Sequence, residues 1–182
     1  MQQDFILPED SLTEYVTGYL LFDGNCEDAL EIGTFENSCS LGIPLGKPFD
    51  FFLGGKSLED ESTFVDLFDK PYFFISHENL TSIWVSGKVR LVFVIFTEKG
   101  LKGVLRQKKK DFNQYIFPLS RIGLPMFNLM IKRELRFNED NVKGIKIIEN
   151  ELQKFFKKTK IEESKDKNEN INYPFSSKVP EK

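Results

Sequence analysis

Two cysteines and a single histidine are the side chains of this chain best suited to nucleophilic catalysis. Cys26 lies in the acidic segment 23–28, where neighbouring carboxylates disfavour the reactive thiolate. Cys39 lies among small residues, which favours burial, and His77 precedes Glu78 but has no activated nucleophile near it in the sequence. These residues are also too few for a zinc module of cysteine and histidine. The sequence favours a non-enzymatic protein without a metal site or cofactor.

Catalysis by carboxylates alone stays open, because the chain contains 28 Asp and Glu residues. The densest cluster is formed by Glu59, Asp60 and Glu61. Adjacent residues of a helix point in different directions, so these carboxylates do not form a catalytic pair there. The cluster predicts the solvated first turn of a helix.

A basic run is the most unusual local feature of the sequence. Residues 106–110 place four cations in five positions, and a serine, an arginine and a glycine follow shortly afterwards. Cations supply charge to a bound phosphate, while glycine lets the backbone approach an anion closely. The stretch predicts a phosphate-binding surface made of Arg106, Lys108, Lys109, Lys110, Ser120, Arg121 and Gly123.

This stretch resembles the PilZ domain, a family that binds cyclic di-GMP and is marked by Arg-x-x-x-Arg and a later Asp/Asn-x-Ser-x-x-Gly. Ser120 and Gly123 match the second mark. Pro118 stands at its leading position, and Lys110 stands where the first mark has its second arginine. The resemblance implies a small β-barrel with a cyclic dinucleotide as ligand.

RNA is the other ligand to consider for the basic run. Phe112 and Tyr115 lie close by, and exposed aromatic rings can stack on RNA bases. The net charge of −3, from 25 basic and 28 acidic residues, excludes a protein that coats nucleic acid with its whole surface. A purely structural alternative is a solvated loop whose charges keep a sheet edge from pairing with neighbours.

The length of 182 residues predicts one domain, and 40% hydrophobic residues with 19 Phe supply a large core. We expect a globular domain over residues 1–160 and a disordered polar tail over 161–182. No apolar stretch is long enough for a membrane span and no signal peptide is recognisable, which predicts a cytoplasmic protein. One alanine, and twenty lysines against five arginines, indicate an AT-rich genome.

The pattern of apolar residues predicts an α+β fold that is mainly antiparallel β, as a meander or small barrel. Strands are expected at residues 15–22, 29–35, 72–75 and 115–117, with a turn at 23–25, and residues 39–47 are expected to form a bent strand or a loop wall. Residues 83–105 are predicted to form a meander of three consecutive antiparallel strands. A short helix is expected near 57–68, and an amphipathic helix near 138–158 with Asn138 as its cap.

These features favour a cytoplasmic interaction or adaptor module that binds a partner protein. The alternatives are a degenerate PilZ-like binder of a cyclic dinucleotide or an RNA-binding protein, both using the basic loop 106–110. For the interaction module, residues 49–53 together with Phe155 and Phe156 predict an exposed aromatic patch of the kind that marks a protein contact.

Overall fold

The computed structural model describes residues 1–33, 39–54, 64–75, 82–105, 116–118, 134–135 and 139–163. The elements in these residues are β1 (Gln2–Ile6), a 3-10 turn η1 (Asp10–Leu12), β2 (Val16–Gly33), β3 (Cys39–Pro44), β4 (Phe49–Gly54), β5 (Phe64–Phe68), β6 (Tyr72–Ile75), β7 (Ser82–Phe96), α1 (Glu98–Leu105), β8 (Ile116–Pro118) and α3 (Asn141–Glu163). Every strand pairing is antiparallel. The predicted α+β class with a mainly antiparallel sheet is therefore confirmed.

Strand β7 is the centre of the sheet. The strand order is β1-β2-β7-β3-β6-β8, and β4 pairs with both β5 and β7. β2 follows β7 along almost its whole length, from the pair Val16–Phe96 to the pair Gly33–Ile83. On the other side of β7, β4 pairs with residues 82–86 and β3 pairs with residues 91–95. β7 therefore joins the part of the sheet formed by β4 and β5 to the part formed by β3, β6 and β8.

The change of partner along β7 takes place at a bend. Gly87 has a φ of 87° and Gly46, between β3 and β4, has a φ of 103°. Both values lie in the left-handed region that glycine adopts without steric cost. The backbone N–H of Leu45 donates to the carbonyl oxygen of Arg90 at 2.8 Å, which fastens the link between β3 and β4 to β7.

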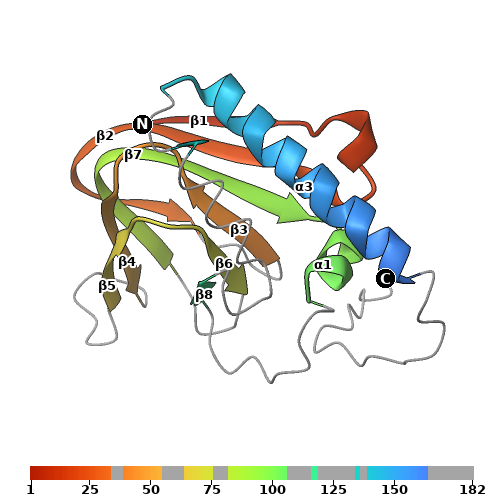
Figure 1. Ribbon diagram of the computed structural model, residues 1–182. Coiled ribbons are helices and arrows are strands. Elements are labelled where there is room, and N and C mark those ends of the chain that lie inside the picture. The colour runs from red at the N-terminus through yellow and green to blue at the C-terminus, as the bar shows by residue number, and fades with distance from the viewer. Residues whose placement is uncertain are drawn as a thin grey trace, which may run out of the picture.

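The two faces of the sheet bury two separate cores. Along β7, Leu91 and Phe93 belong to one core, whereas Val92 and Val94 belong to the other, as the alternation of a strand requires. The first core is aromatic, and Gly42 leaves room there because a Cβ at this position would lie 2.7 Å from the ring of Phe74. In Figure 1, β2 and β7 bend together and carry β4 and β5, while α3 lies across the outer face.

Helix α3 covers the second core. Ile145, Ile148, Leu152 and Phe156 are buried there at helical spacing, which confirms the predicted amphipathic helix. Asp140 caps the helix, because its carboxylate accepts hydrogen bonds from the backbone N–H groups of the second and third helical residues at 2.9 and 3.2 Å. The predicted cap, Asn138, lies outside the described residues. No helix in the described part of the chain is long and apolar enough to cross a membrane.

The predicted meander at 83–105 is wrong. Residues 82–96 form the one continuous strand β7, and residues 98–105 form the helix α1. Gly87 bends the strand without ending it, because both sides of the bend are paired with β2 and with a second strand. The Thr97 hydroxyl accepts a hydrogen bond from the N–H of Gly100 at 3.1 Å, so it caps a helix where the sequence indicated a turn.

The predicted short helix near 57–68 is wrong at residues 64–68, which form β5. Phe68 lies opposite Phe49 in the sheet and their rings stack at 5.3 Å, so cross-strand aromatic packing outweighs the acidic helix-start pattern. Residues 57–63 lie outside the described residues. The predicted turn at 23–25 is also wrong, because β2 continues through it opposite β7.

The remaining predicted strands are found, some with shorter bounds. Residues 16–33 cover most of the strands expected at 15–22 and 29–35, and β3, β6 and β8 match those expected at 39–47, 72–75 and 115–117. Helix α3 continues to Glu163, past the predicted domain boundary at 160. The predicted tail beyond Glu163 lies outside the described residues.

Two glycines test how closely the helices pack. A Cβ at Gly100 would lie 1.9 Å from the backbone oxygen of Tyr15, so Gly100→Ala should lower the free energy of unfolding by about 1–3 kcal/mol. At Gly144, in α3, the nearest atoms to a Cβ are Leu45 methyls at 3.4 Å. Gly144→Ala should therefore stabilise the protein by roughly 0.5–1 kcal/mol through the backbone. Urea unfolding of both variants measures this, and equal shifts would contradict the packing.

Candidate interaction surface

The residues predicted to bind phosphate lie outside the described residues. This applies to Arg106, Lys108, Lys109, Lys110, Ser120, Arg121 and Gly123, and also to His77. The structure therefore does not show whether these side chains converge, and the phosphate-ligand hypothesis stays a prediction. The nearest described residue to the basic run is the buried Leu105 at the end of α1, and the nearest to Ser120 is Pro118 at the end of β8.

Both cysteines are buried and neither forms a disulfide bond. The sulfur of Cys26 lies 3.8 Å from the sulfur of Met1, across the pairing of β1 with β2. Cys39 belongs to the core beneath α3. The part of the chain that the structure describes contains no group of three or more His, Cys, Asp or Glu residues arranged to hold a metal ion.

The predicted exposed aromatic patch is wrong for Phe49, Phe51 and Phe156, while Phe52 and Phe155 are partly buried. Phe49 and Phe51 belong to the aromatic core, with 3% of each residue exposed. Phe156 is also buried, and its ring stacks on that of Tyr15 at 4.2 Å. These three rings are part of the cores and do not form an exposed patch.

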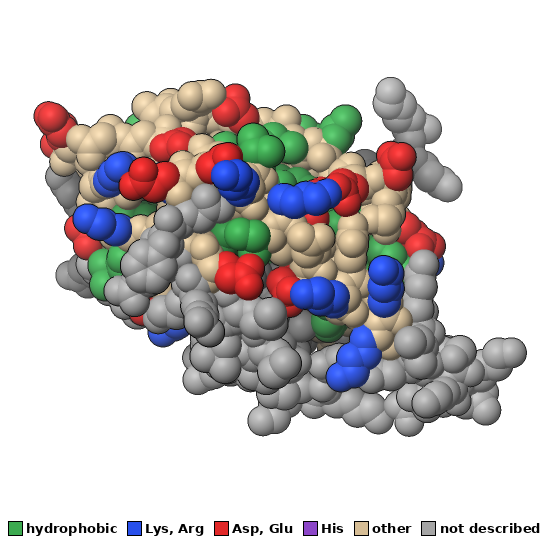
Figure 2. Space-filling view, turned by 45° about the horizontal axis from the view of Figure 1, so that its top comes forward, with side chains coloured by type: hydrophobic (Ala, Val, Ile, Leu, Met, Phe, Trp, Pro, Cys, Tyr) green, Lys and Arg blue, Asp and Glu red, His purple; other side chains and the backbone are tan. Residues whose placement is uncertain are grey.

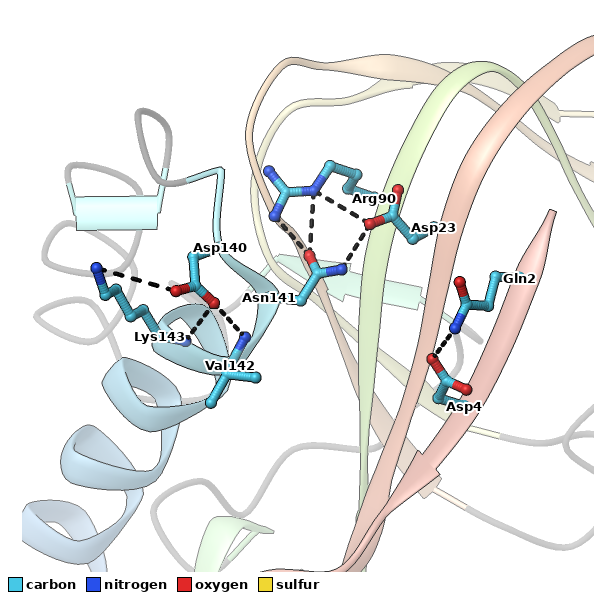
Figure 3. Close-up of polar contacts among 8 residues, drawn as sticks. All are labelled: Gln2, Asp4, Asp23, Arg90, Asp140, Asn141, Val142 and Lys143. Atoms are coloured by element: carbon cyan, nitrogen blue, oxygen red, sulfur yellow. Dashed lines mark hydrogen bonds and ion pairs between the residues drawn. The ribbon is translucent and has the colours of Figure 1, made fainter.

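One polar cluster fastens the beginning of α3 to the sheet. Asp23 on β2 and Arg90 on β7 are register partners, and the Arg90 Nε lies 3.7 Å from the Asp23 Oδ2. Asn141, the first residue of α3, accepts hydrogen bonds from the Arg90 Nε at 3.2 Å and Nη2 at 2.5 Å. Its amide nitrogen donates to the Asp23 Oδ2 at 2.5 Å. Figure 3 shows the three side chains pointing toward one another between the helix and the strands.

A second polar cluster fastens the middle of α3 to the segment around η1. The buried carboxylate of Glu149 accepts a hydrogen bond from the backbone N–H of Glu9 at 2.9 Å. The Gln153 amide donates to the Glu9 carboxylate at 2.9 Å and to the Ser11 hydroxyl at 2.8 Å. Lys146 forms an ion pair with Glu9. Helix α3 is thus held by polar contacts at two places as well as by its apolar face.

Burial raises the pKa of Glu149 and of Tyr19, which lies beneath the same part of α3. It raises the pKa of Glu149, and the nearby Lys146 ammonium and the Tyr19 hydroxyl offset only part of that effect. Burial also raises the pKa of Tyr19, and the charge of Glu149 raises it further. The tyrosine is therefore held as a neutral phenol beneath the helix.

Exposed apolar side chains gather at the N-terminal end of the chain. Among the large apolar residues exposed in the described structure are Met1, Phe5, Leu7, Leu30, Leu67 and Val142. Phe5 is 53% exposed and Leu7 is 74% exposed, and both lie in or directly after β1. This segment is the largest run of exposed apolar side chains along the described sequence.

β1 lies at the margin of the sheet. Within the described residues it pairs with β2 alone, from Gln2–Asp23 to Ile6–Tyr19, so its other row of backbone groups faces outward. Figure 1 shows β1 along this margin, beside the start of β2. Gly18 leaves room for the Phe5 ring, since a Cβ at Gly18 would lie 2.2 Å from that ring. β1 thus offers open hydrogen-bonding groups next to an exposed aromatic ring.

The surface that carries α3 has charges of both signs. Figure 2 shows Lys and Arg side chains intermixed with Asp and Glu, with hydrophobic side chains reaching the surface between them. Ion pairs account for some of this mixing, for example Lys154 with Glu151 and Lys143 with Asp140. Such a surface favours no polyanion over its whole extent.

Comparisons with known proteins give a distant structural likeness and no sequence relative. No protein-family model and no curated protein sequence matches the chain. The apo form of a ToxT variant from Vibrio cholerae has a TM-score of 0.44 and 7% identity, with 83% of this chain and 57% of that chain covered. Unsaturated fatty acid bound wild-type ToxT has a TM-score of 0.41 and 8% identity, with 79% and 54% covered. The chain thus spans less than two thirds of the ToxT chains.

Arg90 should be essential for stability. Arg90→Met removes a largely buried guanidinium and leaves Asp23, whose side chain is 35% exposed, with Asn141 as its remaining hydrogen-bond donor, which should lower the free energy of unfolding by about 1–3 kcal/mol. Lys88→Met, at an exposed position of the same strand, is the matched control and should change it by less than about 0.5 kcal/mol. Denaturant unfolding compares the two variants, and equal losses would contradict the role of the cluster.

Glu149 should make stability depend on pH in a particular direction. Its pKa is raised in the folded protein, so the folded state keeps this proton to a higher pH than the unfolded chain does. The contribution of Glu149 to the free energy of unfolding should then fall as the pH rises from the usual Glu value of about 4.3 through the raised pKa. Glu149→Gln should remove this slope, while Glu139→Gln, at an exposed position, should retain it. Unfolding curves measured across this pH range decide the matter.

Proposed function

We propose that this protein is a non-enzymatic cytoplasmic interaction module that binds a partner protein by adding a strand of the partner to β1. The observation that carries the proposal is the outward-facing margin of β1 beside exposed Phe5 and Leu7. Extended peptides add to such margins through backbone hydrogen bonds, while side-chain contacts supply specificity. Cys26 and Cys39 form no disulfide bond, which fits a reducing compartment.

Successive side chains of β1 point to opposite faces of the sheet, so a strand added to β1 would contact side chains on both faces. Phe5 lies opposite Leu20, whose side chain packs against the aromatic core, whereas Ile6 lies opposite Tyr19 of the other core. An added strand would therefore cover the open side of the Phe5 ring with its own apolar side chain. Each net backbone hydrogen bond contributes about 0.5–1.5 kcal/mol, so a strand as short as β1 needs this apolar contact for specific binding.

The organisation of the polar clusters supports a binding role over a catalytic one. Arg90 and Glu149, the buried charged residues described above, both hold α3 in place. The two cores, one largely aromatic and one covered by α3, consist of apolar side chains on the two faces of the sheet. The accessible feature with clear binding geometry is the sheet margin.

Capture of a partner should depend on the side chains next to β1. The double variant Phe5→Ser with Leu7→Ser should lose a protein that the unchanged chain retains from a native extract, because the apolar contact is removed. Val142→Ser is the matched control, since Val142 is 75% exposed and belongs to α3, not to β1. Mass spectrometry identifies the retained protein, and calorimetry with the purified partner measures the loss, expected at about tenfold or more in Kd.

Equal retention by the unchanged chain and by the Phe5 and Leu7 variant would contradict the proposed surface. Loss of the partner with Val142→Ser alone would move the site to α3. Circular dichroism of each variant establishes that the fold is intact, which is expected because all three side chains are exposed.

A further inference from the structure

Charge is distributed unevenly along the chain. Residues 1–46 contain nine carboxylates and no Lys or Arg, and the first basic side chain is Lys47. These residues include β1, β2 and β3. The margin of the sheet that ends in β1 is therefore built from the acidic part of the sequence.

Part of this acidity is neutralised within the fold. Three of the carboxylates pair with bases from later elements: Asp23 with Arg90, Glu14 with Lys99, and Glu9 with Lys146. The bases belong to β7, α1 and α3. These three carboxylates are therefore neutralised by ion pairs within the fold.

Other carboxylates stay at the margin. Asp4 lies in β1 and accepts a hydrogen bond from the neutral Gln2 amide at 2.8 Å. Glu27 and Asp28 are exposed at the bulge of β2. They lie beyond the pair Gln2–Asp23, which is the last pair that β2 makes with β1. There β2 pairs with β7 and, among the described residues, with no strand on its other side. β1 and this part of β2 form one acidic margin, defined here as residues 2–6 and 25–33.

The acidic margin also carries apolar side chains. Phe5 in β1 and Leu30 in β2 are exposed beside Asp4 and Asp28. A strand added to β1 would meet Asp4 and Phe5 on alternate sides, while Glu27, Asp28 and Leu30 lie on β2 beyond the end of the pairing with β1. Bases opposite the carboxylates would be attracted, whereas carboxylates opposite them would be repelled.

We infer that the partner segment is a basic extended strand in which Lys or Arg alternates with apolar residues. The inference rests on the proposed function and names the chemistry of its partner. A second copy of this chain is a poor occupant, because pairing two acidic margins would double the number of carboxylates without adding a base. The charge complementarity of the margin therefore selects a basic segment of another protein.

Three synthetic peptides of about ten residues test the chemistry, a length set by the strand dimensions of the margin. One alternates Lys with Val, the second alternates Glu with Val, and the third alternates Lys with Gly. Fluorescence anisotropy with the full chain should show binding of the Lys-Val peptide that weakens as salt rises from about 0.05 to 0.5 M. The Glu-Val peptide should not bind, and the Lys-Gly peptide should bind at least several-fold more weakly.

Charge reversal locates the site. Asp4→Lys with Glu27→Lys should weaken binding of the Lys-Val peptide by roughly tenfold. Glu98→Lys with Glu139→Lys makes the same change in net charge at exposed positions near the two helices and is the matched control, expected to retain most of the affinity. Hydrogen exchange should show added protection of the backbone amides of residues 2–6 when the peptide is bound.

The outcomes separate this inference from the proposed function. Equal binding of the Lys-Val and Glu-Val peptides, lost with Phe5→Ser and Leu7→Ser, would overturn the basic partner but support strand addition at β1. Equal loss in both charge-reversed variants would show non-specific attraction and overturn the inference. A dimer in sedimentation that the Phe5 and Leu7 variant separates would make a second copy the occupant and also overturn it.

Discussion

The shared pairing of β7 is the constraint on which the rest of the structure depends. One strand holds β2 along one side and both β3 and β4 along the other. Arg90 lies where β7 changes partner, its carbonyl accepts from Leu45, and its side chain reaches Asp23 and Asn141. The bend, the link between β3 and β4, and the start of α3 therefore meet at one residue.

The position of α3 follows from this constraint and determines which surface stays accessible. The helix is fixed at its start by Arg90 and farther along by Glu149, and its apolar face is buried in the second core. It cannot leave the body without exposing that core, so it is part of the fold and a poor candidate for a detachable binding helix. The open backbone groups of β1 then become the most accessible binding feature among the described residues.

The sequence predicts those elements whose pattern is local. The period of apolar residues is enough for α3, and β-branched and aromatic runs are enough for β2, β3 and the second half of β7. Gly87 and the segment 98–100 misled the prediction because a glycine ends a strand or bends it according to pairings far away in sequence. β1 was missed because five mixed residues show little pattern, and Phe49 and Phe156 were misplaced because burial is decided by tertiary packing.

An open strand such as β1 can pair with any other strand, and the carboxylates of the acidic margin restrict which strands can pair with it. Many proteins protect such margins with lysine or proline, which discourage pairing with any strand. Here the protection is selective, since Asp4, Glu27 and Asp28 oppose a second copy of the same acidic margin while they attract a base. Repulsion of the wrong partner and attraction of the right one then come from the same side chains. A margin of this kind can remain unpaired in isolation and still bind a strand of opposite charge.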